Sequence, residues 1–96
     1  MYSEPASVSI EIPEPLVRLT DGAAAVQVEA GTAAAALEAL WQRFPKLQSR
    51  VLDRHGRLYP YLLLLHNGRT VTHTELATHP LQPGDRIEIV ALAEGG

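Results

Sequence analysis

Cysteine is absent from this chain of 96 residues. Its absence excludes disulfide scaffolds, thiolate metal sites, iron–sulfur clusters and cysteine nucleophiles. Basic residues are scarce too, since eight Lys and Arg stand against eleven Asp and Glu, for a net charge of −3. A protein that binds the phosphate backbone carries a basic stripe, so we expect no nucleic-acid partner. The 46% share of hydrophobic residues is ordinary for a folded domain and argues against disorder.

Long hydrophobic runs are also missing. The longest apolar stretch, Tyr61–Leu65, is far shorter than the roughly 20 residues that a membrane helix needs. Met1–Ser7 has neither the basic residue nor the apolar core of a secretory signal. We therefore expect no membrane partner and a cytoplasmic location. No phosphate-binding glycine motif occurs, so no motif supports nucleotide binding.

Hydrophobic periodicity and turn residues predict one α+β domain over residues 8–90, between a flexible N-terminus (1–7) and a flexible tail (91–96). The expected strands are 8–12, 26–29, 57–66, 69–72 and 86–90, and the expected helix is 33–44, followed by one further helical turn. This order predicts a mixed sheet with one helix across it.

Local signals support the helix and one hairpin. Thr32 stands where an N-cap belongs, and Pro45 ends the helix because the residue before a proline is pushed out of the α region. Asn67-Gly68 is the strongest short hairpin signal, since both residues tolerate a positive φ.

Candidate catalytic and metal-binding residues are few. The histidines are His55, His66, His73 and His79. Their spacing fits no metal-ligand motif, so we expect solvated loop side chains and no metal site. The carboxylates of Asp85 and Glu88 are expected to face water. No constellation of nucleophile, base and acid is visible, and we expect no active site within this chain.

The four leucines 62–65 are apolar on both faces of their strand, whereas a sheet covered on one face favours alternation. One pair can pack under the helix. The other pair meets either another part of this chain, such as a loop or the N-terminal segment, or a partner protein. Tyr61, Leu63 and Leu65 share one parity and form the candidate partner-binding face, to which the aromatic ring adds area.

The sequence ends in Gly95-Gly96, after a predicted strand and a short tail. A terminal dipeptide of this kind can lack any role. It can also thread a channel too narrow for a Cβ and present an unhindered carboxylate.

Taken in order, these features resemble the small ubiquitin-like sulfur carriers. That family includes the small subunit of molybdopterin synthase, the thiamin sulfur carrier and the carrier that feeds a cysteine synthase. The resemblance covers residues 8–96 and is carried by the two strands, the Thr-capped helix, the strand ending in Asn-Gly, Pro83–Ile89 and the final diglycine. Ile12-Pro13 and the loop Leu16–Gly22 are most similar to the cysteine-synthase branch. The resemblance implies a β-grasp fold, with four to five strands and one main helix packed on one face.

The resemblance also implies a chemistry. In that family an E1-like enzyme uses ATP to adenylate the terminal carboxylate, here that of Gly96, and a sulfur donor displaces AMP to leave a thiocarboxylate. The thiocarboxylate then donates sulfur in the biosynthesis of molybdopterin, cysteine, thiamin or a related product. The activating enzyme, and later a sulfur-using enzyme, would grip the residues before Gly96, which are Leu92, Ala93, Glu94 and Gly95. The chain would thus be a co-substrate, monomeric alone and without a bound cofactor.

The tail departs from the family in one respect. Many members carry a proline and then small residues before the diglycine, whereas this chain has Ala91-Leu92-Ala93-Glu94. The charge of Glu94 leads us to expect a cation or water in the partner's channel. The alternative function is a ubiquitin-like modifier that joins target lysines through Gly96. Because Lys46 is the single lysine, long chains built on this protein would have one side-chain acceptor.

Overall fold

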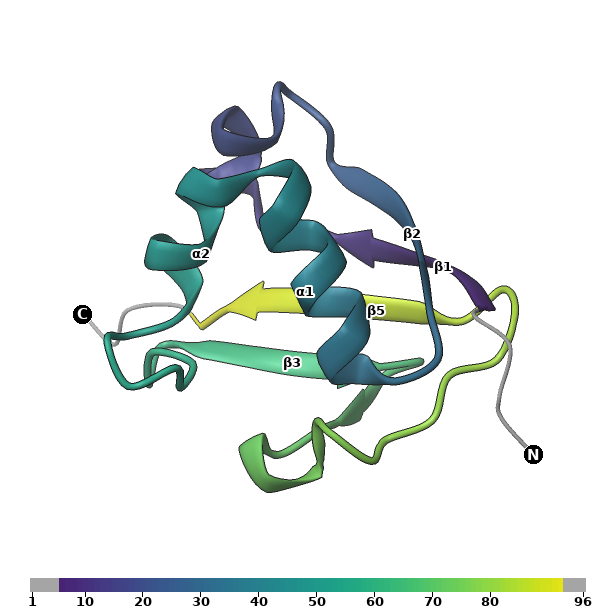
Figure 1. The fold of residues 1–96 in the computed structure, drawn as a ribbon. Coiled ribbons are helices and arrows are strands. Elements are labelled where there is room, and N and C mark those ends of the chain that lie inside the picture. Colours follow the sequence, from purple (N-terminus) through teal and green to yellow (C-terminus); the bar gives the residue numbers. More distant parts are fainter. Residues whose placement is uncertain (1–5, 93–96) are drawn as a thin grey trace.

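Five strands form one mixed sheet in the order β2-β1-β5-β3-β4 (Figure 1). The computed structural model describes residues 6–92. The strands are β1 (Ala6–Glu11), β2 (Ala25–Ala30), β3 (Leu62–His66), β4 (Arg69–Thr70) and β5 (Arg86–Ala91). β1 pairs in parallel with β5, while the β1–β2, β3–β4 and β3–β5 pairs are antiparallel. The predicted mixed sheet is confirmed.

Two helices lie on one face of this sheet. They are α1 (Ala33–Arg43) and α2 (Pro45–Val51). Thr32 caps α1 as predicted, because its hydroxyl oxygen accepts from the Ala35 N–H at 3.2 Å. Pro45 ends α1 and becomes the first residue of α2, a position where its missing N–H costs nothing. The chain therefore has a second helix of two turns where one further turn was predicted.

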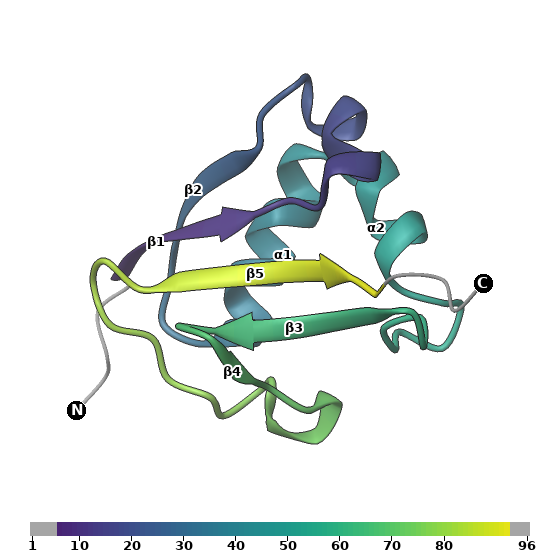
Figure 2. The ribbon, with the colours of Figure 1, turned by 180° about the vertical axis from the view of Figure 1, so that it is seen from behind.

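The core lies between this helical layer and the sheet. Its largest fully buried side chains are Ile10, Leu40, Leu47, Leu64, Ile87, Val8 and Val51, with Thr20. The 3₁₀ helix η1 (Glu14–Thr20), in the loop between the first two strands, packs the buried Leu16 onto this core. Figure 2 views the sheet from behind and shows the strands in front of α1. Among residues 6–92, neither α-helix covers that second face.

Two predicted strands are too long. The strand predicted over 57–66 begins only at Leu62, because Pro60 has no N–H and the chain turns there, with the Leu62 N–H donating to the Tyr59 carbonyl at 2.9 Å. The return strand ends at Thr70, since Thr72 starts the 3₁₀ turn η2 (His73–Glu75) by exchanging hydrogen bonds with Glu75.

The turn between β3 and β4 is the predicted hairpin. Asn67 and Gly68 have φ values of 49° and 89°, as a type I′ turn requires. The turn fixes the pairing of His66 with Arg69.

The termini of the domain also differ from the predicted boundaries. β1 begins at Ala6, which is buried and pairs with Ala30, so Ala6 and Ser7 belong to the sheet and not to a flexible end. At the other end β5 includes Ala91. The remainder of the predicted termini, residues 1–5 and 93–96, lies outside the described residues. Within residues 6–92, no helix has the length and apolar character needed to span a bilayer.

Candidate partner-binding site

The four leucines divide between the two faces of the sheet. Leu62 and Leu64 are 5% and 2% exposed and point into the core. Leu63 and Leu65 are half-buried and take the opposite, helix-free face. The sequence left open which parity faces outward, and the structure assigns the odd-numbered pair to that face.

Val90 lies opposite Leu63 on β5 and extends the apolar area. We call Tyr61, Leu63, Leu65 and Val90 the open-face patch. Its polar border is formed by the exposed Arg86, whose guanidinium lies 3.5 Å from Glu11 and 3.6 Å from Glu88. Exposed ion pairs of this kind contribute little to stability. An apolar centre with a charged border is the usual composition of a protein–protein interface.

The chain leaves the sheet beside the open-face patch. The Leu92 N–H donates to the Tyr61 carbonyl at 2.7 Å, one residue after the end of β5. Tyr61 is 47% and Leu92 is 43% exposed. The ring of Tyr61 stacks on that of Tyr59, with centroids 5.4 Å apart and planes 7° from parallel. The structure thus places Leu92 beside Tyr61, at one end of the open-face patch.

The other predicted tail residues are Ala93, Glu94, Gly95 and Gly96, which lie outside the described residues. Their roles stay predictions.

A partly buried polar cluster at the C-terminal end of β3 was not predicted from the sequence. The imidazole of His66 donates from Nε2 to Asp85 Oδ2 at 2.7 Å, and its Nδ1 shares a 2.7 Å hydrogen bond with His79 Nε2. Asp85 is only 9% exposed. The expectation that His66, His79 and Asp85 face water is therefore wrong. His79 and Asp85 lie 13 and 19 positions after His66, and they meet it only because the loop between η2 and β5 returns to the end of β3.

The cluster is a structural device. Asp85 also accepts from the Gln82 N–H at 2.7 Å and from Asn67 Nδ2 at 3.1 Å, so it ties the loop before β5 to the β3–β4 turn. Burial raises the pKa of Asp85, but the hydrogen bonds from Gln82, His66 and Asn67 outweigh burial and hold the pKa below 3.8. The side chains of Asp85, His66 and His79 are hydrogen-bonded in a row, so they do not surround a common point at which a ligand could bind. Within residues 6–92, no group of three or more His, Asp or Glu could hold a metal ion.

Replacing Asp85 by Asn should lower the free energy of unfolding at about pH 7 by about 1–3 kcal/mol, because buried donors lose a charged acceptor. Since the pKa of Asp85 is lowered on folding, the stabilisation is present above pH 3.8 and is lost as the pH falls through the folded value. The difference between the two proteins should therefore shrink at about pH 3. The midpoints of urea unfolding at both pH values measure this difference in stability, with Glu88→Gln as the control. Equal midpoints at pH 7 would show that the cluster adds no stability.

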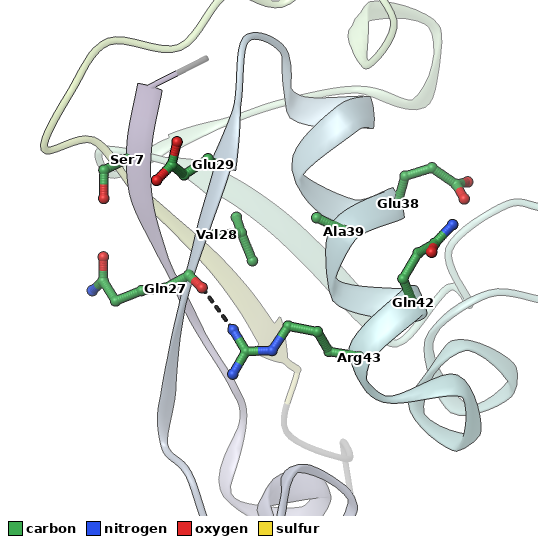
Figure 3. Close-up of a pocket in the computed structure, with 8 residues that line it drawn as sticks. All are labelled: Ser7, Gln27, Val28, Glu29, Glu38, Ala39, Gln42 and Arg43. Carbon is green, nitrogen blue, oxygen red and sulfur yellow. Dashed lines mark hydrogen bonds between the residues drawn. The ribbon is translucent and has the colours of Figure 1, made fainter.

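A hollow of about 560 Å³ lies between β2 and α1 (Figure 3). Figure 3 shows Arg43 reaching from α1 across to β2, where its guanidinium donates to the Gln27 carbonyl at 2.7 Å. β2 is an edge strand, and this contact occupies one of the backbone acceptors on its outer side. The hollow is at the opposite edge of the sheet from β3 and β4, so it is separate from the open-face patch.

A mixed five-stranded sheet folded around one main helix, with its last strand running out beside a helix-free face, defines a ubiquitin-like β-grasp protein. Known structures agree. SAMP1 from Haloferax volcanii is 26% identical, with a TM-score of 0.79 over 95% of this chain and 100% of that one. The chain belongs to the ThiS family, whose family model matches residues 10–96.

Two further similar structures show the same fold at lower identity. CysO from Mycobacterium tuberculosis is 22% identical, with a TM-score of 0.79 over 90% of this chain and 99% of that one. CysO from Amycolatopsis orientalis, solved in a complex with BexX, is 21% identical, with a TM-score of 0.80 over 93% of this chain and 99% of that one. No curated protein matches the chain by sequence. The fold expected from the resemblance is confirmed.

Proposed function

We propose that this protein is a sulfur carrier whose Gly96 carboxylate is adenylated and then converted to a thiocarboxylate. The observation that carries the proposal is the match to the ThiS family, which extends over the terminal Gly95-Gly96. The geometry supports it, because β5 and Leu92 lead the chain out beside the open-face patch. A partner that covers the patch would receive the tail at the same time.

The proposed reaction at Gly96 has two steps, adenylation and sulfur transfer. The carboxylate of Gly96 attacks the α-phosphate of ATP, forms the acyl-adenylate and releases pyrophosphate. Sulfide, or a donor at the same oxidation level, then adds to the acyl carbon, and the bond to AMP breaks to leave the thiocarboxylate. The protein supplies the acyl group and the docking surface, while an E1-like enzyme binds ATP and supplies the catalytic groups. The carrier is a co-substrate in this scheme.

A downstream sulfur-using enzyme takes the place of the activating enzyme in the second half of the cycle. The Amycolatopsis CysO was crystallised as a complex with BexX, so a relative of the same fold forms a complex with another protein. A carrier that visits two enzymes in turn must release each of them. We therefore propose a monomeric carrier that binds its partners transiently through the open-face patch.

A ubiquitin-like modifier is the second candidate. It is favoured by SAMP1 from Haloferax volcanii, a small archaeal modifier protein that is 26% identical to this chain. A modifier would also pass through the Gly96 adenylate but would end as an amide on target lysines. The exposed Lys46 is the single side-chain amine of this chain that could accept a second copy.

The absence of cysteine allows a direct test of thiocarboxylate formation. A thiol-alkylating reagent has no cysteine to modify in this chain, so labelling after incubation with an E1-like enzyme, ATP and sulfide reports a thiocarboxylate. We expect label only when all three are present. Products of higher mass, with no label, would support the modifier. Neither label nor conjugates with an enzyme that is active on its own carrier would contradict both functions.

A further inference from the structure

The charges of this mildly acidic chain are unevenly distributed. Residues 43–57 contain five of its eight basic residues and one of its eleven acidic residues, a local charge of +4 in a chain of net charge −3. Four of the five lie on α2 and the loop that follows it. We call these four the basic surface, and they are Lys46, Arg50, Arg54 and Arg57.

The basic surface faces solvent. All four side chains are exposed, and none has a carboxylate partner among residues 6–92. Lys46 and Arg50 are four residues apart and share one face of α2. The acidic residue of the segment, Asp53, is used within the loop, where Oδ1 accepts from the backbone N–H groups of His55 at 2.8 Å and of Arg57 at 3.1 Å. The four basic side chains therefore lie exposed on α2 and the loop after it, with Asp53 close to Arg57.

One member of the basic surface, Arg54, lines a hollow of about 450 Å³ between α2 and the following loop, and Asp53 lines it too. Leu52, Arg54 and Tyr59 contribute to its walls, and the Tyr59 hydroxyl donates to the Ser49 carbonyl at 3.3 Å. The same Tyr59 ring stacks on Tyr61 of the open-face patch. The hollow, with Arg54 in its wall, is therefore continuous with the site where the chain leaves the sheet.

The arrangement of the elements agrees with these contacts. Figure 1 shows α2 and its loop at the end of the sheet toward which β5 runs. Figure 2 shows the same relation from behind. A protein that binds the open-face patch and receives the tail thus meets the basic surface at its border.

We propose that the basic surface is a second docking element, which binds an acidic segment of the enzyme that takes up the C-terminal tail. This inference rests on the proposed function. The acidic segment lies along Lys46, Arg50 and Arg54, and one of its apolar side chains enters the hollow against Leu52 and Tyr59. Its contribution is to steer the encounter and to fix the orientation in which the tail enters the partner.

A protein partner fits better than a nucleic acid. Outside residues 43–57 the chain carries three basic and ten acidic residues, which would repel a long phosphate backbone. The basic surface covers one short helix and one loop, whereas a duplex or a single strand needs a longer positive track. A short acidic protein segment can contact the basic surface without approaching the acidic residues on the remainder of the protein.

The test uses the full chain and a purified E1-like enzyme that adenylates it. Initial rates of pyrophosphate release, measured against carrier concentration, give KM and kcat for R50E/R54E and for the wild type. We expect the KM for the carrier to rise about ten-fold at about 0.05 M NaCl, with kcat nearly unchanged. The difference should largely disappear at about 0.5 M NaCl, where exposed charges are screened. The charge-conserving R50K/R54K should keep most of the wild-type KM.

The matched control is R18E/R69E, which changes the net charge equally at two exposed positions outside the basic surface. A KM for R50E/R54E equal to that of R18E/R69E would overturn the proposal, as would an equal rise at both salt concentrations. If R50E/R54E keeps the wild-type KM but loses affinity for a single-stranded oligonucleotide, the surface binds nucleic acid instead. If no E1-like enzyme releases pyrophosphate with the wild-type chain, the proposed function itself has failed.

Discussion

Removal of Gly96 should abolish thiocarboxylate formation while leaving the fold intact. The described fold does not depend on Gly96, because the buried hydrophobic core within residues 6–92 runs from Ala6 to Ile89. The melting temperature should therefore change by no more than about 1 °C. The new terminal carboxylate, on Gly95, would stop about 3.5 Å short of the position at which an activating enzyme attacks. Loss of pyrophosphate release together with an unchanged thermal melt is the expected result.

A second variant separates the position of the carboxylate from the identity of the last residue. Gly96→Ala keeps the chain length and adds one Cβ, which a channel built for glycine excludes. We expect slow turnover from this variant and none from the deletion. A shortened chain that is activated as fast as the wild type would contradict the assignment of Gly96 as the reacting residue.

Replacement of Leu63 by Asp should weaken binding to the activating enzyme by roughly thirty-fold or more, the cost of about 2 kcal/mol for a central interface residue. A charge at this position would be buried against the partner without a counter-ion. Because Leu63 is half-buried on the helix-free face, the free energy of unfolding should fall by no more than about 1 kcal/mol. Calorimetric titration and urea unfolding measure the two effects.

Two control variants are needed to interpret the effect of Leu63→Asp. Leu64→Ala removes a core side chain from the same strand and should cost about 2–5 kcal/mol of stability. Gln27→Asp introduces the same charge at an exposed position of β2, the far edge of the sheet, and should leave binding unchanged. If Leu63→Asp unfolds as readily as Leu64→Ala, the face belongs to the core. If it binds as well as Gln27→Asp, the open-face patch is not the interface.

Elements with local signals could be predicted from the sequence. Thr32 and Pro45 bound α1 because capping and the proline ring act within a few residues. Asn67-Gly68 fixes the hairpin for the same reason. The leucines predicted a strand with two apolar faces, but their assignment to core and surface needed the register of β3 on β5, which pairs Leu64 with the buried Ile89.

Features that depend on long-range contacts could not be predicted. The sequence predicted a strand from Arg57, and the sheet excludes its first residues because Pro60 turns the chain away. The hydrogen bonds of His66 with Asp85 and His79 join the end of β3 to two loop residues that only the assembled sheet brings close to it. The basic surface is different, because its residues come from one segment, and the positions of the charges along the sequence indicate it although the net charge of −3 does not.

The central claim is that Gly96 carries the sulfur, and intact mass spectrometry tests it most directly. The protein is incubated with an E1-like enzyme, ATP and sulfide, and its mass is compared with that of the starting chain. The account predicts a gain equal to the difference between one sulfur and one oxygen atom, confined by fragmentation to the residue at position 96. An unchanged mass, or a sulfur atom located anywhere else in the chain, would contradict it.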